Sequence, residues 1–146
     1  MATHGLPAWP WTSTPWEELP PPELVLLEAA RAWQHALREG GSPMAAARLP
    51  LATMEVADSA PALDAVLLTV LRPGLLGCRI CPRVTEGEAA LLTALSLAQR
   101  APRREALAAF LRLAPTGSAY AAVGPALRIG LEFRRAGLWM RHRLRV

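Results

Sequence analysis

Two cysteines three positions apart are the residues of this sequence best suited to chemistry. Cys78 and Cys81 enclose the segment Cys-Arg-Ile-Cys, and the chain contains no other cysteine. Such a pair supplies half of a structural zinc site, which needs four ligands, or forms a dithiol that cycles with a disulfide. Arg79 and Arg83 favour thiolates by their charge. The interpretation that we favour is a pair of reduced cysteines with a structural role, and the metal site and the redox pair are its alternatives.

A metal site at this position needs further ligands. His142 lies near the end of the chain, where a terminal strand against the cysteine segment would bring it towards both thiols. The fourth ligand would then come from a second copy of the chain. We expect no cofactor, with zinc or iron at Cys78, Cys81 and His142 as the alternative.

Other catalytic signatures are absent from the sequence. It contains no glycine-rich phosphate loop of known spacing, no nucleophile elbow and no paired histidines. We therefore expect a protein that is not an enzyme.

The segment after the cysteines contains the clearest helix start of the chain. Thr85 and Glu88 have the spacing of a capping box, in which each side chain bonds the backbone N–H of the other residue. In the helix that follows, one face is apolar and predicted to be buried, while Thr93 and Ser96 point elsewhere. The residues of the apolar face are Leu91, Leu92, Leu95 and Ala98.

Helices are also predicted on both sides of this segment. The first covers residues 22–39, with Arg31, Gln34 and Arg38 turned away from its apolar face. Ser42 begins a second helix, which Pro50 can split, and a third follows Ser59. Helices after Pro102 and Thr116 complete the set, and Gly124 with Pro125 can break the last one.

Period-2 alternation predicts two short strands. Apolar residues alternate along residues 75–81, and again along residues 138–146 after a glycine cap at Gly137. The fold class is therefore mainly α: a compact bundle of about five to six short helices with at most a small two-stranded β element, residues 75–81 with 138–146. Within one compact unit, residues 1–22 form a Pro/Trp-rich irregular arm, residues 23–74 the N-terminal helices and residues 75–146 a basic helical half.

The C-terminal half resembles a known family. Residues 84–107 are similar to the opening of a winged-helix DNA-binding domain of the response-regulator type. The matching positions are Thr85, Glu88, Leu91, Leu92, Leu95, Arg104 and Leu107. The resemblance implies that a helix around Arg128, Arg134 and Arg135 enters the major groove, and that residues 139–146 form the wing.

Charge is distributed unevenly along the 146 residues. The net charge is +4, but residues 101–146 hold nine arginines against Glu105 and Glu132, a net of +7 that leaves −3 for residues 1–100. Arginine is the only basic residue type besides histidine, which indicates a GC-rich coding background. The candidate contacts to nucleic acid or another anion are Arg128, Arg134, Arg135, Arg141, Arg143 and Arg145.

Tryptophans in the N-terminal arm are the candidate contacts to a protein partner. Trp9, Trp11 and Trp16 alternate with prolines, so they either lie on the helical body or anchor a partner. We expect a non-enzymatic binding, regulatory or assembly protein that acts through a protein partner or a homo-oligomer. A nucleic-acid-binding regulator and a small metal- or redox-linked protein are the alternatives. No apolar run is long enough to span a membrane, and we expect a cytoplasmic location.

Overall fold

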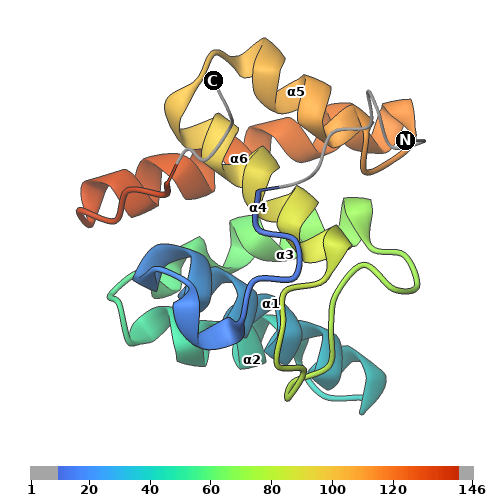
Figure 1. The fold of residues 1–146 in the computed structure, drawn as a ribbon, viewed down its shortest axis with the longest axis vertical. Helices are drawn as coiled ribbons and strands as arrows, with labels where there is room; N and C mark the ends of the chain where they lie inside the picture. Colours follow the sequence, from blue (N-terminus) through green and yellow to red (C-terminus); the bar gives the residue numbers. More distant parts are fainter. Residues whose placement is uncertain (1–9, 142–146) are drawn as a thin grey trace.

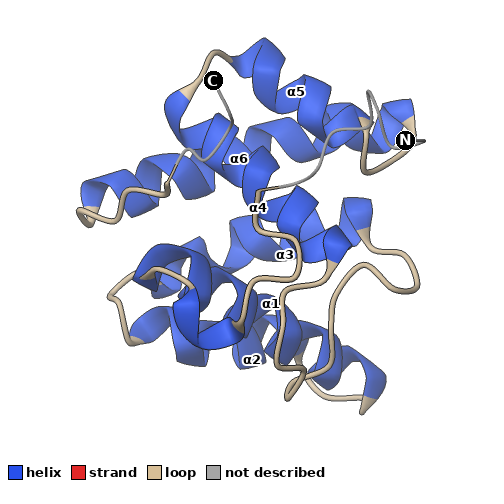
Figure 2. Cartoon of the chain, viewed as in Figure 1, coloured by secondary structure: helices blue, strands red, loops and turns tan. Residues whose placement is uncertain are grey.

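A bundle of six α-helices makes up most of residues 10–141, the part of the chain that the computed structural model describes (Figures 1 and 2). The helices are α1 (Pro21–Arg38), α2 (Pro43–Ala52), α3 (Ala60–Val70), α4 (Glu86–Arg100), α5 (Arg103–Leu111) and α6 (Thr116–Arg135). Two 3-10 turns, η1 (Trp16–Glu18) and η2 (Ala57–Ser59), precede α1 and α3. The predicted mainly α fold class is confirmed.

Local sequence signals set most helix ends. The Ser42 side chain accepts from the Ala45 N–H at the start of α2, and Gly137 ends the turn after α6 with φ +78°. The two internal prolines do not divide their helices, because α2 continues past Pro50 and α6 past Pro125. Packing of α6 against α3, α4 and α5 offsets the hydrogen bond that Pro125 cannot donate.

Helix α4 occupies the middle of the bundle. In Figure 1, α1 and α2 lie at one end of the molecule and α5 and α6 at the other, with α3 and α4 between them. Every residue of α4 from Glu88 to Gln99 is buried, so the prediction that Thr93 and Ser96 face away from the core is wrong. Their hydroxyls are satisfied by backbone carbonyls, Thr93 on Ala89 and Ser96 on Arg141.

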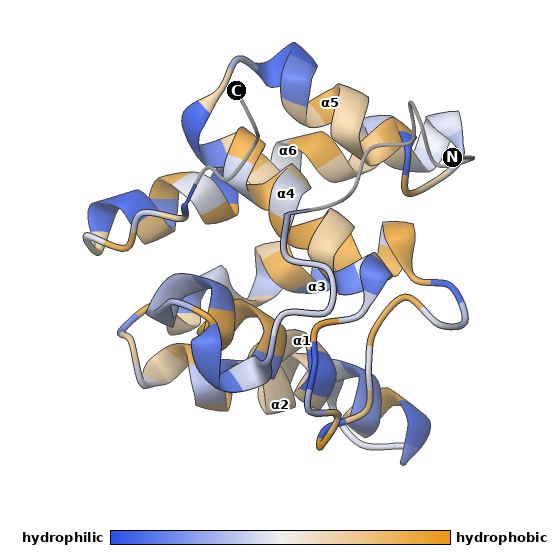
Figure 3. Ribbon diagram, in the orientation of Figure 1, coloured by the Kyte–Doolittle hydropathy of each residue, from blue (hydrophilic) through white to orange (hydrophobic). Residues whose placement is uncertain are grey.

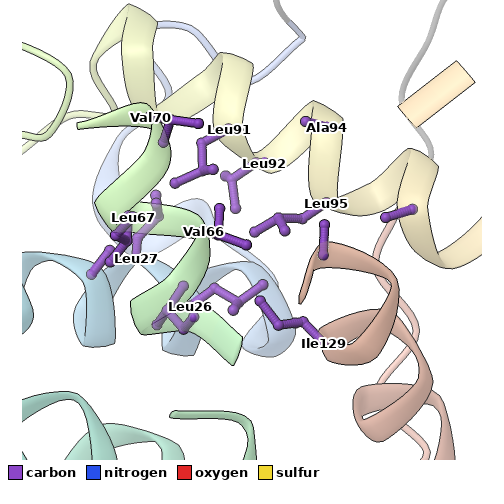
Figure 4. Packing of buried hydrophobic residues seen from close by; sticks show 14 of the residues in the cluster. Leu26, Leu27, Val66, Leu67, Val70, Leu91, Leu92, Ala94, Leu95 and Ile129 are labelled. Carbon is purple, nitrogen blue, oxygen red and sulfur yellow. The ribbon is translucent and has the colours of Figure 1, made fainter. Parts of the chain in front are cut away.

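The core joins helices from both halves of the chain. Figure 4 shows side chains of α1, α3, α4 and α6 packed against one another. The residues labelled there are Leu26, Leu27, Val66, Leu67, Val70, Leu91, Leu92, Ala94, Leu95 and Ile129, and all belong to one buried cluster. Figure 3 shows hydrophilic residues along α1, where α4 leads into α5, and at the C-terminal end of α6.

A glycine lets α4 and α6 approach closely. A Cβ built on Gly130 would lie 2.9 Å from the Cα of Gln99, closer than real side chains come to a backbone. The Gln99 amide in turn donates to the Gly130 carbonyl at 3.3 Å. This crossing fixes the C-terminal half of α6 against the end of α4.

The predicted strand pairing is wrong for the residues described. Residues 75–81 form a bend and a turn instead of a strand, and the single β-bridge between residues 10 and 141 joins Pro15 to Arg83. Residues 138–141 run along α4 instead, because the buried side chain of Gln99 bonds their backbone on two sides. The helices α4, α5 and α6 pack against one another, but residues 138–141 form no hairpin of a wing. Residues 142–146, which carry the remainder of the predicted strand and wing, lie outside the described part.

No helix between residues 10 and 141 combines the length and the apolar character that crossing a membrane requires.

Candidate dithiol site

The two cysteines lie on the connection between α3 and α4. Cys78 is exposed and Cys81 is half-buried, and their Sγ atoms are 2.7 Å apart. A tight turn brings them together, since the Cys81 N–H donates to the Cys78 carbonyl at 3.2 Å and the Cys78 N–H to Cys81 Sγ at 3.1 Å. A disulfide bond is about 2.05 Å long, so the sulfurs need to approach by only about 0.7 Å to bond.

The two thiols differ in acidity. The ionised Cys78 sulfur can accept a hydrogen bond from the Cys81 thiol, which lowers the pKa of Cys78, and the backbone N–H of Ile80 adds to this effect. The same hydrogen bond raises the pKa of Cys81, because its proton is held by Cys78. Cys78 is therefore the stronger candidate nucleophile. Once Cys78 has formed a mixed disulfide, Cys81 is placed to attack its sulfur.

Arg31 of α1 holds the loop from beneath. Its Nη1 donates to the Cys81 carbonyl at 2.9 Å and its Nη2 to the Arg83 carbonyl at 3.1 Å, although Arg31 is only 2% exposed. The guanidinium lies 3.9 Å from the ring centroid of Trp16, a cation–π contact. The sequence predicts that Arg31 lies on the side turned away from the apolar face, but it does not predict the burial of this side chain. The helix face opposite the apolar stripe is covered by this loop and by η1.

Glu88 balances the buried charge of Arg31. Its carboxylate is fully buried and accepts from Arg31 Nε at 2.7 Å and from Arg31 Nη2 at 2.9 Å. Each oxygen accepts one further hydrogen bond, from the N–H of Gly77 at 2.8 Å and from that of Thr85 at 2.9 Å. The Glu88 N–H donates to the Thr85 hydroxyl, so the predicted capping box is confirmed. One side chain therefore caps α4, pairs with Arg31 and holds the start of the cysteine loop.

Close packing around the Arg31 guanidinium explains why a glycine, Gly77, precedes Cys78. A Cβ on Gly77 would lie 2.9 Å from Arg31 Nη2. The Gln34 amide donates to the Gly77 carbonyl at 3.3 Å, so α1 fixes both ends of the loop. Like Arg31, Gln34 is buried by the loop that covers this side of α1.

The N-terminal arm supports the loop from its other side. The Trp16 N–H donates to the Pro82 carbonyl at 2.8 Å, and backbone hydrogen bonds join Val84 to Thr14 and to Ser13. Trp11 is 2% exposed and part of the core, and Trp16 is half-buried under Arg31. Both indoles therefore pack on the protein's own body, which is the first of the two interpretations given above. Trp9 lies outside the described residues.

The surface next to the loop has an apolar tip and a groove. Ile80, between the two cysteines, is 89% exposed. A groove of about 500 Å³ opens beside the loop, and Trp16, His35, Leu49 and Arg79 are among its lining residues. A partner that reaches Cys78 would also meet this groove.

The sulfur geometry fits a disulfide better than a metal ion. Zinc–sulfur bonds of about 2.3 Å at a tetrahedral ion place two thiolates about 3.8 Å apart. The thiols of Cys78 and Cys81 are closer than that. Between residues 10 and 141, no group of three or more His, Cys, Asp or Glu side chains could hold a metal ion, and His142 lies outside this range. The metal site stays a prediction.

The predicted anion-binding arginines lie in different surroundings. Arg128 pairs with Glu132 through an Nε to Oε2 distance of 2.9 Å. Arg135 lines a depression together with Glu55, Asp58 and Glu132, whereas Arg134 approaches the ring of Trp139. Arg141 is exposed, and Arg143 and Arg145 lie outside the described residues. Arg128 and Arg135 therefore lie beside acidic residues, whereas Arg134 lies next to Trp139, a residue that the sequence did not single out.

Comparison of the chain with models of protein families, with curated proteins and with solved structures gives no match in any of the three.

Proposed function

We propose that this protein is a redox-responsive binding module in which Cys78 and Cys81 alternate between a dithiol and a disulfide. The observation that carries the proposal is the 2.7 Å separation of the two sulfurs on an exposed loop. The loop is already ordered, because Arg31 and Glu88 fix its backbone to α1 and α4. The pair can therefore close without a rearrangement of the fold.

The chemistry is a thiol–disulfide exchange between the protein and a disulfide-bearing partner. The Cys78 thiolate attacks one sulfur of the partner disulfide, which forms a mixed disulfide and releases one partner thiolate. The Cys81 thiol then loses its proton, attacks Cys78 Sγ and releases the second partner thiolate. The protein gives up two electrons and two protons, and the partner disulfide takes them up as two thiols.

Binding forms the other half of the proposal. The exposed Ile80 side chain and the groove near Leu49 and Arg79 lie next to the reactive sulfur. Apolar side chains displayed in this way favour a protein partner over a small hydrophilic disulfide. Oxidation removes the thiolate from this surface, and the affinity for the partner changes with it.

Equilibration of the purified protein in mixtures of reduced and oxidised glutathione, followed by alkylation and mass spectrometry, tests the proposal. We expect one intramolecular disulfide, formed reversibly at a defined potential. The Cys81→Ser variant is expected to accumulate a mixed disulfide with glutathione, whereas Cys78→Ser reacts far more slowly because its remaining thiol is the less acidic and less exposed one. Thiols that stay reduced throughout the series, or that form only intermolecular disulfides, would overturn the proposal.

A further inference from the structure

A second surface is built where residues 138–141 follow α4. Side chains of α4 and α1 bond the backbone of this segment at five points. The bonds are Gln99 Nε2 to the Leu138 carbonyl at 2.9 Å, the Met140 N–H to Gln99 Oε1 at 2.7 Å, Arg100 Nε to the Met140 carbonyl at 2.5 Å, Ser96 Oγ to the Arg141 carbonyl at 3.2 Å and the Arg141 N–H to Glu23 Oε2 at 2.7 Å. The course of this segment is therefore fixed by specific polar contacts and not by apolar burial alone.

The consequence of this anchoring is that a tryptophan is held on the outside. Met140 is fully buried, while its neighbour Trp139 is 47% exposed. Two guanidinium groups from different helices approach the Trp139 ring, Arg100 at 5.0 Å and Arg134 at 5.9 Å from its centroid. The indole and the two guanidinium groups together form an aromatic and cationic surface.

Acidic groups among the described residues offset the positive charge of this surface only in part. In the part of the chain that the structure describes, no carboxylate lies within 4.0 Å of the guanidinium groups of Arg100, Arg134 or Arg141. Glu23 interacts electrostatically with both Arg100 and Arg141, but its side chain is fully buried beneath the segment. Arginines at the C-terminal ends of helices are favoured by the helix dipole, but the dipole gives no reason to expose an indole between them.

We propose that Trp139, Arg100, Arg134 and Arg141 form a contact site for single-stranded nucleic acid. An unpaired base stacks on the exposed indole or on a guanidinium plane, and Arg134 and Arg141 bind the flanking phosphates. Paired bases in a duplex hide the faces that such stacking needs. An acidic peptide supplies negative charge but lacks a planar group at every residue, so the combination of Trp139 with the guanidinium groups of Arg100 and Arg134 fits a single strand best. This site is separate from the dithiol and does not depend on the redox proposal.

Fluorescence anisotropy of a labelled oligothymidine at low salt tests the site with the full chain. Removal of the stacking partner in Trp139→Ala is expected to weaken binding by about 5- to 150-fold, the contribution of one stacked base. Trp139→Phe keeps an aromatic ring and is expected to retain most of the affinity. Arg134→Ala removes one phosphate contact and is expected to reduce the slope of log affinity against log salt by about 0.7. Arg38→Ala, at the exposed end of α1, is the matched control and leaves binding unchanged.

Competing ligands separate the single strand from other anions. An abasic oligonucleotide of equal length, a duplex, polyglutamate and vesicles with an anionic lipid are added as competitors. The proposal stands if the oligothymidine binds and Trp139→Ala weakens it while circular dichroism shows the native fold. It fails if no complex forms at low salt, if the abasic strand, polyglutamate or the vesicles bind as tightly, or if Trp139→Ala and Arg38→Ala bind alike.

Discussion

Replacing Arg31 by methionine would test the buried ion pair that links α1 to α4 and holds the dithiol loop. Methionine fills much of the arginine volume but supplies no charge and no donors. The variant leaves Glu88 fully buried with two of its four hydrogen bonds, those from Gly77 and Thr85. It also removes the donors to the Cys81 and Arg83 carbonyls.

The expected loss of stability is large for a single substitution. Removing one partner of a buried ion pair costs about 3–5 kcal/mol, because the other charge stays desolvated. The two loop carbonyls lie near the surface and can turn to water, so their contribution is about 1 kcal/mol or less each. Since a domain of this kind is stable by about 5–15 kcal/mol in total, Arg31→Met is expected to fold but to unfold at a much lower urea concentration.

Urea unfolding followed by far-ultraviolet circular dichroism measures this difference. The matched control is Arg128→Met, whose partner Glu132 lies one turn away and whose side chain is 67% exposed, so it is expected to lose about 0.5 kcal/mol at most. The double variant Arg31→Met with Glu88→Gln removes the orphaned charge and is expected to be less destabilised than the sum of the two single variants. Equal midpoints for Arg31→Met and Arg128→Met would refute the assignment of the pair as a buried, interdependent unit.

Three further outcomes follow from the geometry. Gly130→Ala is expected to destabilise the protein by about 1–3 kcal/mol through a clash with the backbone of Gln99. The control is Gly117→Ala near the start of the same helix, where an added Cβ meets nothing within 4 Å, and it is expected to be neutral or to gain about 0.5 kcal/mol. Thermal unfolding compares the two variants, and equal effects would contradict the close approach of α6 to Gln99. Burial raises the pKa of Glu23 above its ordinary 4.5, so the folded state binds the proton more tightly than the unfolded chain does. The stability of the native protein relative to Glu23→Gln is therefore expected to fall as the pH rises from 4.5 through the raised pKa. Urea titrations at several pH values measure this, and a native protein that becomes more stable than Glu23→Gln with rising pH would contradict the prediction. A hydrogen bond with the Cys81 side chain lowers the pKa of Cys78, so the pH midpoint of Cys78 alkylation is expected to lie below 9.0 and to rise in Cys81→Ala, which has no donor at this position. An unchanged midpoint would show that this hydrogen bond is not the cause.

Helix positions could be predicted from the sequence because their signals are local. The capping box at Thr85, the cap at Ser42 and the proline before α5 each act within four residues, and the structure has a helix start at all three. The breaks expected at Pro50 and Pro125 do not occur, since the stability of α2 and α6 depends on neighbouring helices that a local pattern does not reveal.

The support of the dithiol could not be predicted in the same way. Arg31 and Glu88 are 57 residues apart, and each has a complete local explanation, Arg31 on a polar helix face and Glu88 in a capping box. The alternation of apolar residues along residues 75–81 does not come from a strand. Leu75 and Leu76 are buried under the start of α4, while Cys78, Arg79 and Ile80 turn outwards around a tight loop. A strand needs the backbone of a second strand beside it. Here side chains bond the backbone of this region instead, among them those of Arg31, Gln34 and Glu88.

The anchoring of this loop also determines what a redox change can do to the protein. A disulfide that closes a four-residue loop restricts the unfolded chain by only about 2 kcal/mol, and strain in so small a ring reduces that gain further. Because Arg31 and Glu88 already order the loop in the dithiol state, formation of the disulfide is expected to change the structure of α1 and α4 very little. Oxidation therefore alters the chemistry of the exposed surface around Cys78 and Ile80 far more than the stability of the fold. A signal of this kind has to be detected by a molecule that contacts that surface, which is why the redox and binding parts of the proposed function belong together.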